Sequence, residues 1–251
     1  MKPAAEVGNR IDEVGRTLAE ALGDAALCIG VYGSAAGDDF AAGHSDVNLV
    51  IVLSRVTFAD LRLIGTTLER EAGDLLFATP LVITPSFLRD ARDSFPIEID
   101  DIGARHRVLH GEDLLGGLAV EQTHLRQEAE REARSELLRL RALVMHRPPE
   151  ESLQRALSGL GATIGVIERA LLRKSAAAQP LRGATLFAEV ERRQGIRLSA
   201  LARLHEMRDG SESWPTGDAL DDLVAACLRD VETLVAWVDS HAQDSIGSEE
   251  R

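Results

Sequence analysis

The sequence is short of cysteine, of long apolar runs and of positive charge. Only two cysteines, Cys28 and Cys227, occur in 251 residues, which excludes a disulfide framework and is typical of a reducing compartment. No stretch approaches the roughly 18 uninterrupted apolar residues of a membrane span, and the first residues lack the apolar core of a signal peptide. We therefore expect a cytoplasmic protein with no membrane partner.

The net charge of −13 is unevenly divided along the chain. Residues 1–118 carry 10 basic and 19 acidic side chains, whereas the remainder carries 18 and 22. Binding to long nucleic acid depends on the neutralisation of phosphates by Lys and Arg. The acidic balance therefore argues against long DNA or RNA as a partner and favours a small molecule or a protein.

Two apolar stretches flank a short polar loop near residue 40. The first, residues 28–34, ends in Gly33-Ser34 and is typical of a strand that leads into a tight turn. The second, residues 45–53, is also a predicted strand. Successive side chains of a strand point to opposite faces of the sheet. We therefore predict that Asp46 and Asn48 project to the same side while their apolar neighbours enter a core.

Residues 95–102 form a third candidate strand. Its acids Glu98 and Asp100 would share one face, and Ile97 and Ile99 would share the other. Carboxylates at alternate positions of a strand are costly unless they are paired or bound to a cation. The pattern therefore indicates a candidate metal site.

Taken in order, these residues resemble the nucleotidyltransferase superfamily with a DNA polymerase β-like fold. The signature of that family is Gly-Ser, then Asp-x-Asp about ten residues later, then an acid between apolar neighbours. Gly33-Ser34, Asp46-x-Asn48 and Ile97-Glu98-Ile99 follow this order. The resemblance covers roughly residues 11–115.

The resemblance implies a nucleoside triphosphate, with ATP favoured, and magnesium ions as ligands. Backbone amides at a Gly-Ser turn suit phosphate oxygens, and hard oxygen ligands suit Mg²⁺. Asp46 and Glu98 are then the catalytic carboxylates, and Asp100 is the fallback for the third acid. The implied ligands are Gly33, Ser34 and Asn48 for the nucleotide, and Asp46, Asn48, Glu98 and Asp100 for the metal.

Position 48 departs from the family pattern, because Asn stands where active enzymes have the second Asp. Asn offers a neutral carbonyl oxygen and no charge, which weakens the attraction for two divalent ions. Three functions follow as alternatives. The first is metal-dependent transfer of a nucleoside monophosphate to a hydroxyl of a small molecule or protein. The others are an inactive nucleotide- or metabolite-binding module and an antitoxin-like partner protein, as among the minimal nucleotidyltransferases.

Residues 107–113 predict a further strand that ends in a turn at Gly111. In antibiotic-modifying and minimal nucleotidyltransferases a similar segment closes the sheet near the nucleotide. The alternative is that Gly111 is simply a turn residue and that Glu112 and Asp113 cap the next element.

Apolar residues at helical spacing and capping signals predict the remaining elements. Helices are predicted over 7–22, 57–72, 85–92, 121–146, 153–171, 185–194, 199–207 and 220–238, with a short strand over 80–84. The fold class is therefore α+β, with a nucleotidyltransferase-type mixed sheet in residues 1–118, an all-α bundle in 119–241 and a polar tail in 242–251. This order resembles the aminoglycoside-modifying enzymes, in which the acceptor binds between the domains. The apolar stripes of the bundle fit either a homodimer or an internal core.

Overall fold

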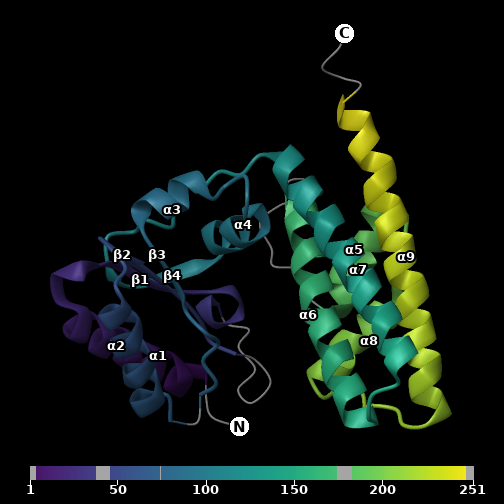
Figure 1. Ribbon diagram of the computed structural model, residues 1–251, viewed down its shortest axis with the longest axis horizontal. Coiled ribbons are helices and arrows are strands. Elements are labelled where there is room, and N and C mark those ends of the chain that lie inside the picture. The colour runs from purple at the N-terminus through teal and green to yellow at the C-terminus, as the bar shows by residue number, and fades with distance from the viewer. Residues whose placement is uncertain (1–3, 38–45, 74, 174–182, 247–251) are drawn as a thin grey trace. The chain divides into compact units, whose positions relative to one another are not determined.

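The computed structural model describes residues 4–37, 46–73, 75–173 and 183–246 (Figure 1). The chain divides into two compact units, Met1–Val120 and Glu121–Arg251. The first unit contains a mixed sheet with helices and the second contains helices, which confirms the predicted α+β class. No helix in the described ranges is both long and apolar enough to cross a membrane.

The sheet has four strands in the order β3-β2-β1-β4. The central strand β1 (Ala26–Tyr32) pairs antiparallel with β2 (Asn48–Leu53) and with β4 (His106–Gly111), and β2 pairs parallel with β3 (Leu81–Ile83). Apolar residues of β1 and β2 are almost entirely buried. The two stretches that flank the polar loop are therefore buried strands, as predicted, and they lie next to each other at the centre of the sheet.

Helix α1 (Ala4–Leu22) packs against β1 and β4 with the apolar stripe that the sequence predicts. The buried residues of the stripe are Val7, Ile11, Val14, Leu18 and Leu22. Helix α2 (Phe58–Glu71) begins at the predicted cap, Thr57. The Thr57 hydroxyl accepts from the Asp60 amide at 3.2 Å, and the Asp60 carboxylate accepts from the Thr57 amide at 2.9 Å. This reciprocal capping box fixes where α2 begins.

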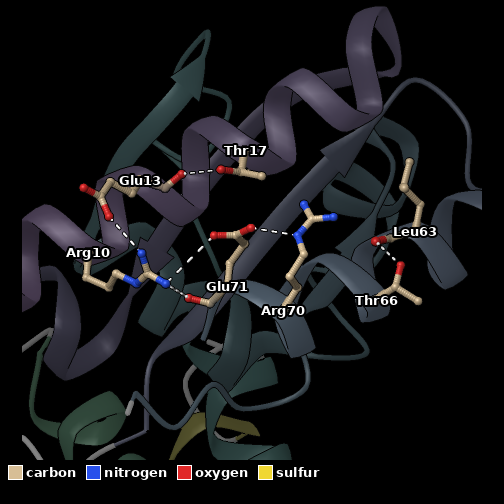
Figure 2. Close-up of polar contacts among 7 residues, drawn as sticks. All are labelled: Arg10, Glu13, Thr17, Leu63, Thr66, Arg70 and Glu71. Carbon is tan, nitrogen blue, oxygen red and sulfur yellow. Dashed lines mark hydrogen bonds and ion pairs between the residues drawn. The ribbon is translucent and has the colours of Figure 1, made fainter. Parts of the chain in front are cut away.

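Arg10 on α1 holds the end of α2, as Figure 2 shows. Its Nη2 donates to the backbone carbonyl of Glu71 at 2.6 Å and lies 3.9 Å from the Glu71 carboxylate. Its Nη1 donates to Glu13 at 3.0 Å, and Arg70 donates to the other Glu71 oxygen at 2.8 Å. Because the carbonyls of a last helical turn lack partners within the helix, the Arg10 guanidinium satisfies one of them.

The predicted strand over 95–102 is wrong, because these residues form most of helix α4 (Pro96–Ala104). Pro96 occupies the first turn of the helix, where its missing N–H costs nothing. Ile99 and Ile102, three residues apart, are both buried, and this spacing belongs to a helix face. The apolar and acidic residues alternate over too short a stretch to distinguish a strand from a helix. The preceding helix α3 (Pro85–Asp90) lies where a short helix is predicted.

The second unit is built from five helices within the described ranges: α5 (Gln122–His146), α6 (Glu150–Arg173), α7 (Gly183–Gln194), α8 (Ser199–Arg208) and α9 (Asp218–Ile246). Helix α5 packs along α9 and against α6, while α7 and α8 pack against α6 (Figure 1). Ion pairs reinforce the contact between α5 and α9, with Arg134 at 2.5 Å from Asp239 and Arg141 at 2.9 Å from Glu232. Helix α9 runs five residues into the predicted polar tail, whose last residues lie outside the described ranges.

Candidate functional site

The candidate site begins where strand β1 ends. Tyr32 is followed by the short 3₁₀ turn η2 (Gly33–Ala36), in which Gly33 has φ 72°, a left-handed conformation that Gly adopts without steric cost. The Gly33 amide donates to the carbonyl of Arg105 at 3.1 Å, so the residue between α4 and β4 holds the turn. The predicted Gly-Ser turn is present at the predicted place.

Asn48 stands next to this turn. It is the first residue of β2 and pairs with Tyr32 across the sheet. Its side-chain Nδ2 lies 3.4 Å from the point that a Cβ on Gly33 would occupy, so the amide faces the turn. Asp46 is exposed and precedes the strand, separated from Asn48 by the fully buried Val47. Val47 forms a parallel bridge with Phe77, and burial alternates from Asp46 to Asn48, but the strand itself begins at Asn48. The predicted common face of Asp46 and Asn48 stays a prediction.

Helix α4 brings acidic side chains towards the same strand end. Burial raises the pKa of the Tyr32 phenol, and the negative charges of Asp101 and then Glu98 raise it further. Glu98 and Asp101 are three residues apart and lie on one face of α4, whereas Asp100 is rotated roughly 200° from Glu98. The acid that shares a helix face with Glu98 is therefore Asp101, and the role of Glu98 as a catalytic carboxylate stays a prediction. The predicted shared face of Glu98 and Asp100 is wrong, because it required a strand.

The predicted metal ligands Asp46, Asn48, Glu98 and Asp100 offer oxygen atoms, which is the donor chemistry that Mg²⁺ prefers. Among the residues that the structure describes, no group of three or more His, Cys, Asp and Glu side chains is arranged to hold a metal ion. The assignment of these residues as ligands therefore stays a prediction. The donor set fits a weakly held ion better than a preformed metal centre, because the side chain at position 48 carries no charge.

His106, at the start of β4, is the neighbour of Tyr32 on the side of the sheet opposite to Asn48. The two residues pair across the sheet, and the imidazole of His106 contacts the Ile102 carbonyl at 2.9 Å and the Asp113 carboxylate at 3.1 Å. Asp113 also accepts from the amides of Leu115 at 3.0 Å and Gly116 at 2.9 Å. These hydrogen bonds, the one from Gly116 foremost, lower the pKa of the Asp113 carboxyl. Asp113 thus caps the turn that follows β4, while β4 itself pairs with β1 at the edge of the sheet, so both interpretations of residues 107–113 stay predictions.

The sequence interpretation missed Asp101, Arg105 and His106. The first two depend on α4 being a helix, since its second half carries Asp101 and its end places Arg105 beside Gly33. His106 is placed by its pairing with Tyr32 in the sheet. Pro96 at the beginning of the stretch was the available signal, because proline is favoured in a first helical turn and disfavoured inside a sheet.

No protein-family model matches the sequence, and no curated protein matches it. Among solved structures, the chain is similar to the spectinomycin adenyltransferase AAD(9) from Enterococcus faecialis, crystallised with ATP and spectinomycin. The TM-score is 0.59 at 12% sequence identity, and the match covers 92% of this chain and 98% of that one. The similarity shows that the two proteins share a fold.

Proposed function

We propose that the protein transfers a nucleoside monophosphate from a nucleoside triphosphate, with ATP favoured, to a hydroxyl group. The hydroxyl oxygen would bond to the α-phosphorus, pyrophosphate would leave, and the hydroxyl proton would pass to a carboxylate of the site. The observation that carries the proposal is the Gly-Ser turn at the end of β1, with Asn48 facing it and the acids of α4 approaching it. An adenyltransferase solved with ATP shares the fold, which supports the same choice.

Each part of the site has a role in this reaction. The amides of Gly33 and Ser34 would bind phosphate oxygens, since backbone N–H groups at a tight turn suit anions. Asp46 and Glu98 would be the catalytic carboxylates, with Asn48 beside them. Magnesium, bound by these oxygens, would supply charge neutralisation at the transferred phosphoryl group. The acidic charge of the chain favours a small molecule or a protein as acceptor over long nucleic acid.

A second candidate function is nucleotide binding without transfer, and Asn48 is the observation that favours it. Calorimetric titration of ATP, with and without Mg²⁺, into the wild type and Asp46→Ala tests the site itself. Pyrophosphate release over a panel of hydroxyl acceptors tests transfer, with Mg²⁺ and Mn²⁺ both supplied. Magnesium-dependent binding that Asp46→Ala abolishes, together with pyrophosphate release, supports the enzyme.

The variant Asn48→Asp separates the two functions. If the remaining site is intact, a second carboxylate strengthens metal binding and raises pyrophosphate release well above the wild-type rate. If the wild type binds ATP and neither protein releases pyrophosphate with any acceptor, the protein is a binding module. If neither protein binds a nucleotide, the proposed function is wrong.

A further inference from the structure

His106 lies where three parts of the first unit meet. Its backbone begins β4 and pairs with Tyr32 at the end of β1. Its imidazole Nδ1 lies 2.9 Å from the carbonyl oxygen of Ile102 on α4, and its Nε2 lies 3.1 Å from Oδ1 of Asp113 in the turn after β4. The His106 side chain is 13% exposed, so the ring is largely shielded from water.

Both partners of the His106 ring are hydrogen-bond acceptors. A backbone carbonyl cannot donate, and neither can an ionised carboxylate. Asp113 is held in the ionised form, because hydrogen bonds from the amides of Gly116 and Leu115 lower the pKa of its carboxyl. A neutral imidazole has one N–H and satisfies one of the two contacts, whereas an imidazolium donates to both.

Asp113 is the charged group that contacts the ring, since the hydrogen bonds of the ring within the described residues are those to Ile102 and Asp113. Arg107 points to the opposite face of the sheet, where it pairs with Asp12 of α1. The other titratable or charged groups on the surrounding elements are Cys28 and Tyr32 of β1, Glu98, Asp100 and Asp101 of α4, and the chain neighbours Arg105 and Glu112.

The contacts of His106 border the Gly-Ser turn. Arg105, the residue before it, accepts the hydrogen bond from the Gly33 amide at 3.1 Å, so a movement of the junction between α4 and β4 moves that acceptor. An N–H donated to Ile102 also satisfies a carbonyl near the end of α4, where helix carbonyls lack partners within the helix.

We propose that His106 is a positioning residue of the candidate site that acts with a proton on both ring nitrogens. In that form the ring ties α4 to the turn at Asp113 and holds the Gly-Ser turn in place. Loss of one proton releases one of the two ties and loosens the turn. The inference rests on the proposed function only for the choice of ATP as a probe, because the positioning is measured without a ligand.

The test is nuclear magnetic resonance of the full-length protein between about pH 5 and 8, where histidine titrates. The nitrogen chemical shifts of the His106 ring report its protons, because the two nitrogens are alike in an imidazolium and differ in a neutral ring. Exchange of the Gly33 amide with solvent, relative to an unfolded peptide at the same pH, reports its protection. We expect this protection to fall about fivefold as the pH rises, the factor for one lost hydrogen bond, with the midpoint of the His106 ring.

Three variants separate positioning by the charged ring from a merely structural role. His106→Gln should lower the protection of Gly33 at low pH and remove its pH dependence. Asp113→Asn should move the midpoints of the ring and of Gly33 together to lower pH, because it removes the negative charge beside Nε2. His110→Gln, at an exposed histidine of the same strand, is the matched control and should keep the wild-type profile. A merely structural role would lower the protection equally at every pH.

A His106 ring that is neutral over the whole range would overturn the inference, as would Gly33 protection that does not follow the ring. If the ring keeps both protons throughout, an unchanged Gly33 protection in folded His106→Gln overturns it, and a lowered one supports it. Calorimetric titration of ATP with Mg²⁺ on either side of the midpoint separates this failure from that of the proposed function. Equal ATP affinity at both pH values rejects the positioning role, whereas no ATP binding rejects the function and leaves the inference to the Gly33 result.

Discussion

The Glu168 carboxylate accepts a hydrogen bond from the side-chain amide of Gln194 at 2.8 Å, inside the helical unit. Glu168 is fully buried on α6, and its second oxygen, Oε1, has no hydrogen-bond partner within the described ranges. The Oε1 atom of Gln194 lacks a partner there as well. A proton on Glu168 would supply a donor where two acceptors lack one. Burial accordingly raises the pKa of Glu168 to about 7, although the bond from Gln194 acts in the opposite direction.

We predict that Glu168→Gln stabilises the helical unit at pH 8 and leaves its stability nearly unchanged at pH 4.5. The folded pKa of about 7 lies above the usual value near 4.5, so stability is fully present at low pH and falls as the pH rises to about 7. Because glutamine does not ionise, the variant avoids this loss, and its unfolding free energy at pH 8 should exceed that of the wild type by about 3 kcal/mol. Both tryptophans, Trp214 and Trp237, lie in the helical unit, so their fluorescence during denaturant unfolding reports on it.

The control for this prediction is Glu191→Gln on α7. Glu191 is an exposed carboxylate paired with Arg197 at 2.6 Å, and its loss is expected to change the unfolding free energy by less than about 1 kcal/mol. A Glu168→Gln variant that is less stable than the wild type at pH 8 would contradict the assignment of an ionised, poorly satisfied carboxylate.

We predict that His205 changes the unfolding free energy with pH in the direction opposite to Glu168, over almost the same pH range. Burial, followed by the charges of Arg208 and Arg169, lowers the pKa of His205 to about 4. The His205 ring packs on Phe187 with centroids 5.4 Å apart. Because the folded pKa is depressed below about 6.5, the unfolded chain takes up a proton first, and stability falls as the pH drops from about 6.5 to 4. The wild type therefore shows a flat profile between about pH 4.5 and 6.5, where the two effects cancel.

The variant His205→Asn should expose the pH dependence of the unfolding free energy that comes from Glu168. Asparagine retains a side-chain donor for the hydrogen bond to the Gly161 backbone but does not titrate. We expect the variant to be less stable than the wild type at pH 7 because it loses the ring contact. Between pH 6.5 and 4.5 its unfolding free energy should rise by about 2–3 kcal/mol, measured by tryptophan fluorescence in denaturant. An unchanged flat profile would mean that His205 is not held neutral.

Arg10 is predicted to contribute more to the first unit than Arg70, although both contact Glu71 (Figure 2). The Arg10 guanidinium bonds a backbone carbonyl and joins two helices, whereas the Arg70 side chain is 67% exposed and bonds only its neighbour within the described contacts. Arg10→Gln should lower the unfolding free energy by about 1 kcal/mol, and Arg70→Gln by less than about 0.5 kcal/mol. Thermal unfolding followed by circular dichroism measures both, and equal effects would contradict the bridging role.

The elements predicted correctly are those in which local chemistry and tertiary packing agree. The stripe of α1, the cap at Thr57 and the two apolar strands around Gly33 each have a signal within a few residues, and burial in the fold confirms each one. The prediction failed at α4 because Ile97, Glu98, Ile99 and Asp100 alternate as they would in a strand. The buried residues Ile99 and Ile102, three apart, instead have the spacing of a helix face. Packing, which the sequence does not display, determined the outcome.

The same failure explains what was missed in the candidate site. The Gly-Ser turn, Asn48 and Glu98 became candidates because they belong to a recognisable ordered pattern. Arg105 was missed because its part in the site arises from a contact with Gly37, far away in the sequence. Asp101 was missed because only the helical rotation of α4 brings it to the side of Glu98. Contacts of this kind need the folded chain.

Tyr32 provides a direct test of that rotation, because it is the only tyrosine in the chain. Its absorbance change at alkaline pH therefore reports on a single phenol in the candidate site. Burial, then Asp101 and, to a smaller extent, Glu98 raise its pKa above the usual value. We predict that Asp101→Asn lowers the pKa of Tyr32 and that Glu98→Gln lowers it less, since each removes a negative charge that disfavours the phenolate.

Asp100→Asn is the matched control, since it removes the same charge from the next position of α4. The helix turns this side chain away from Glu98, so the pKa of Tyr32 should stay at the wild-type value. A strand would give the opposite order, with Asp100 acting alongside Glu98 and Asp101 on the far face. Circular dichroism at each pH confirms that the titrated protein is folded. A shift with Asp100→Asn that equals the shift with Asp101→Asn would contradict the helical arrangement and, with it, the placement of the α4 acids at the Gly-Ser turn.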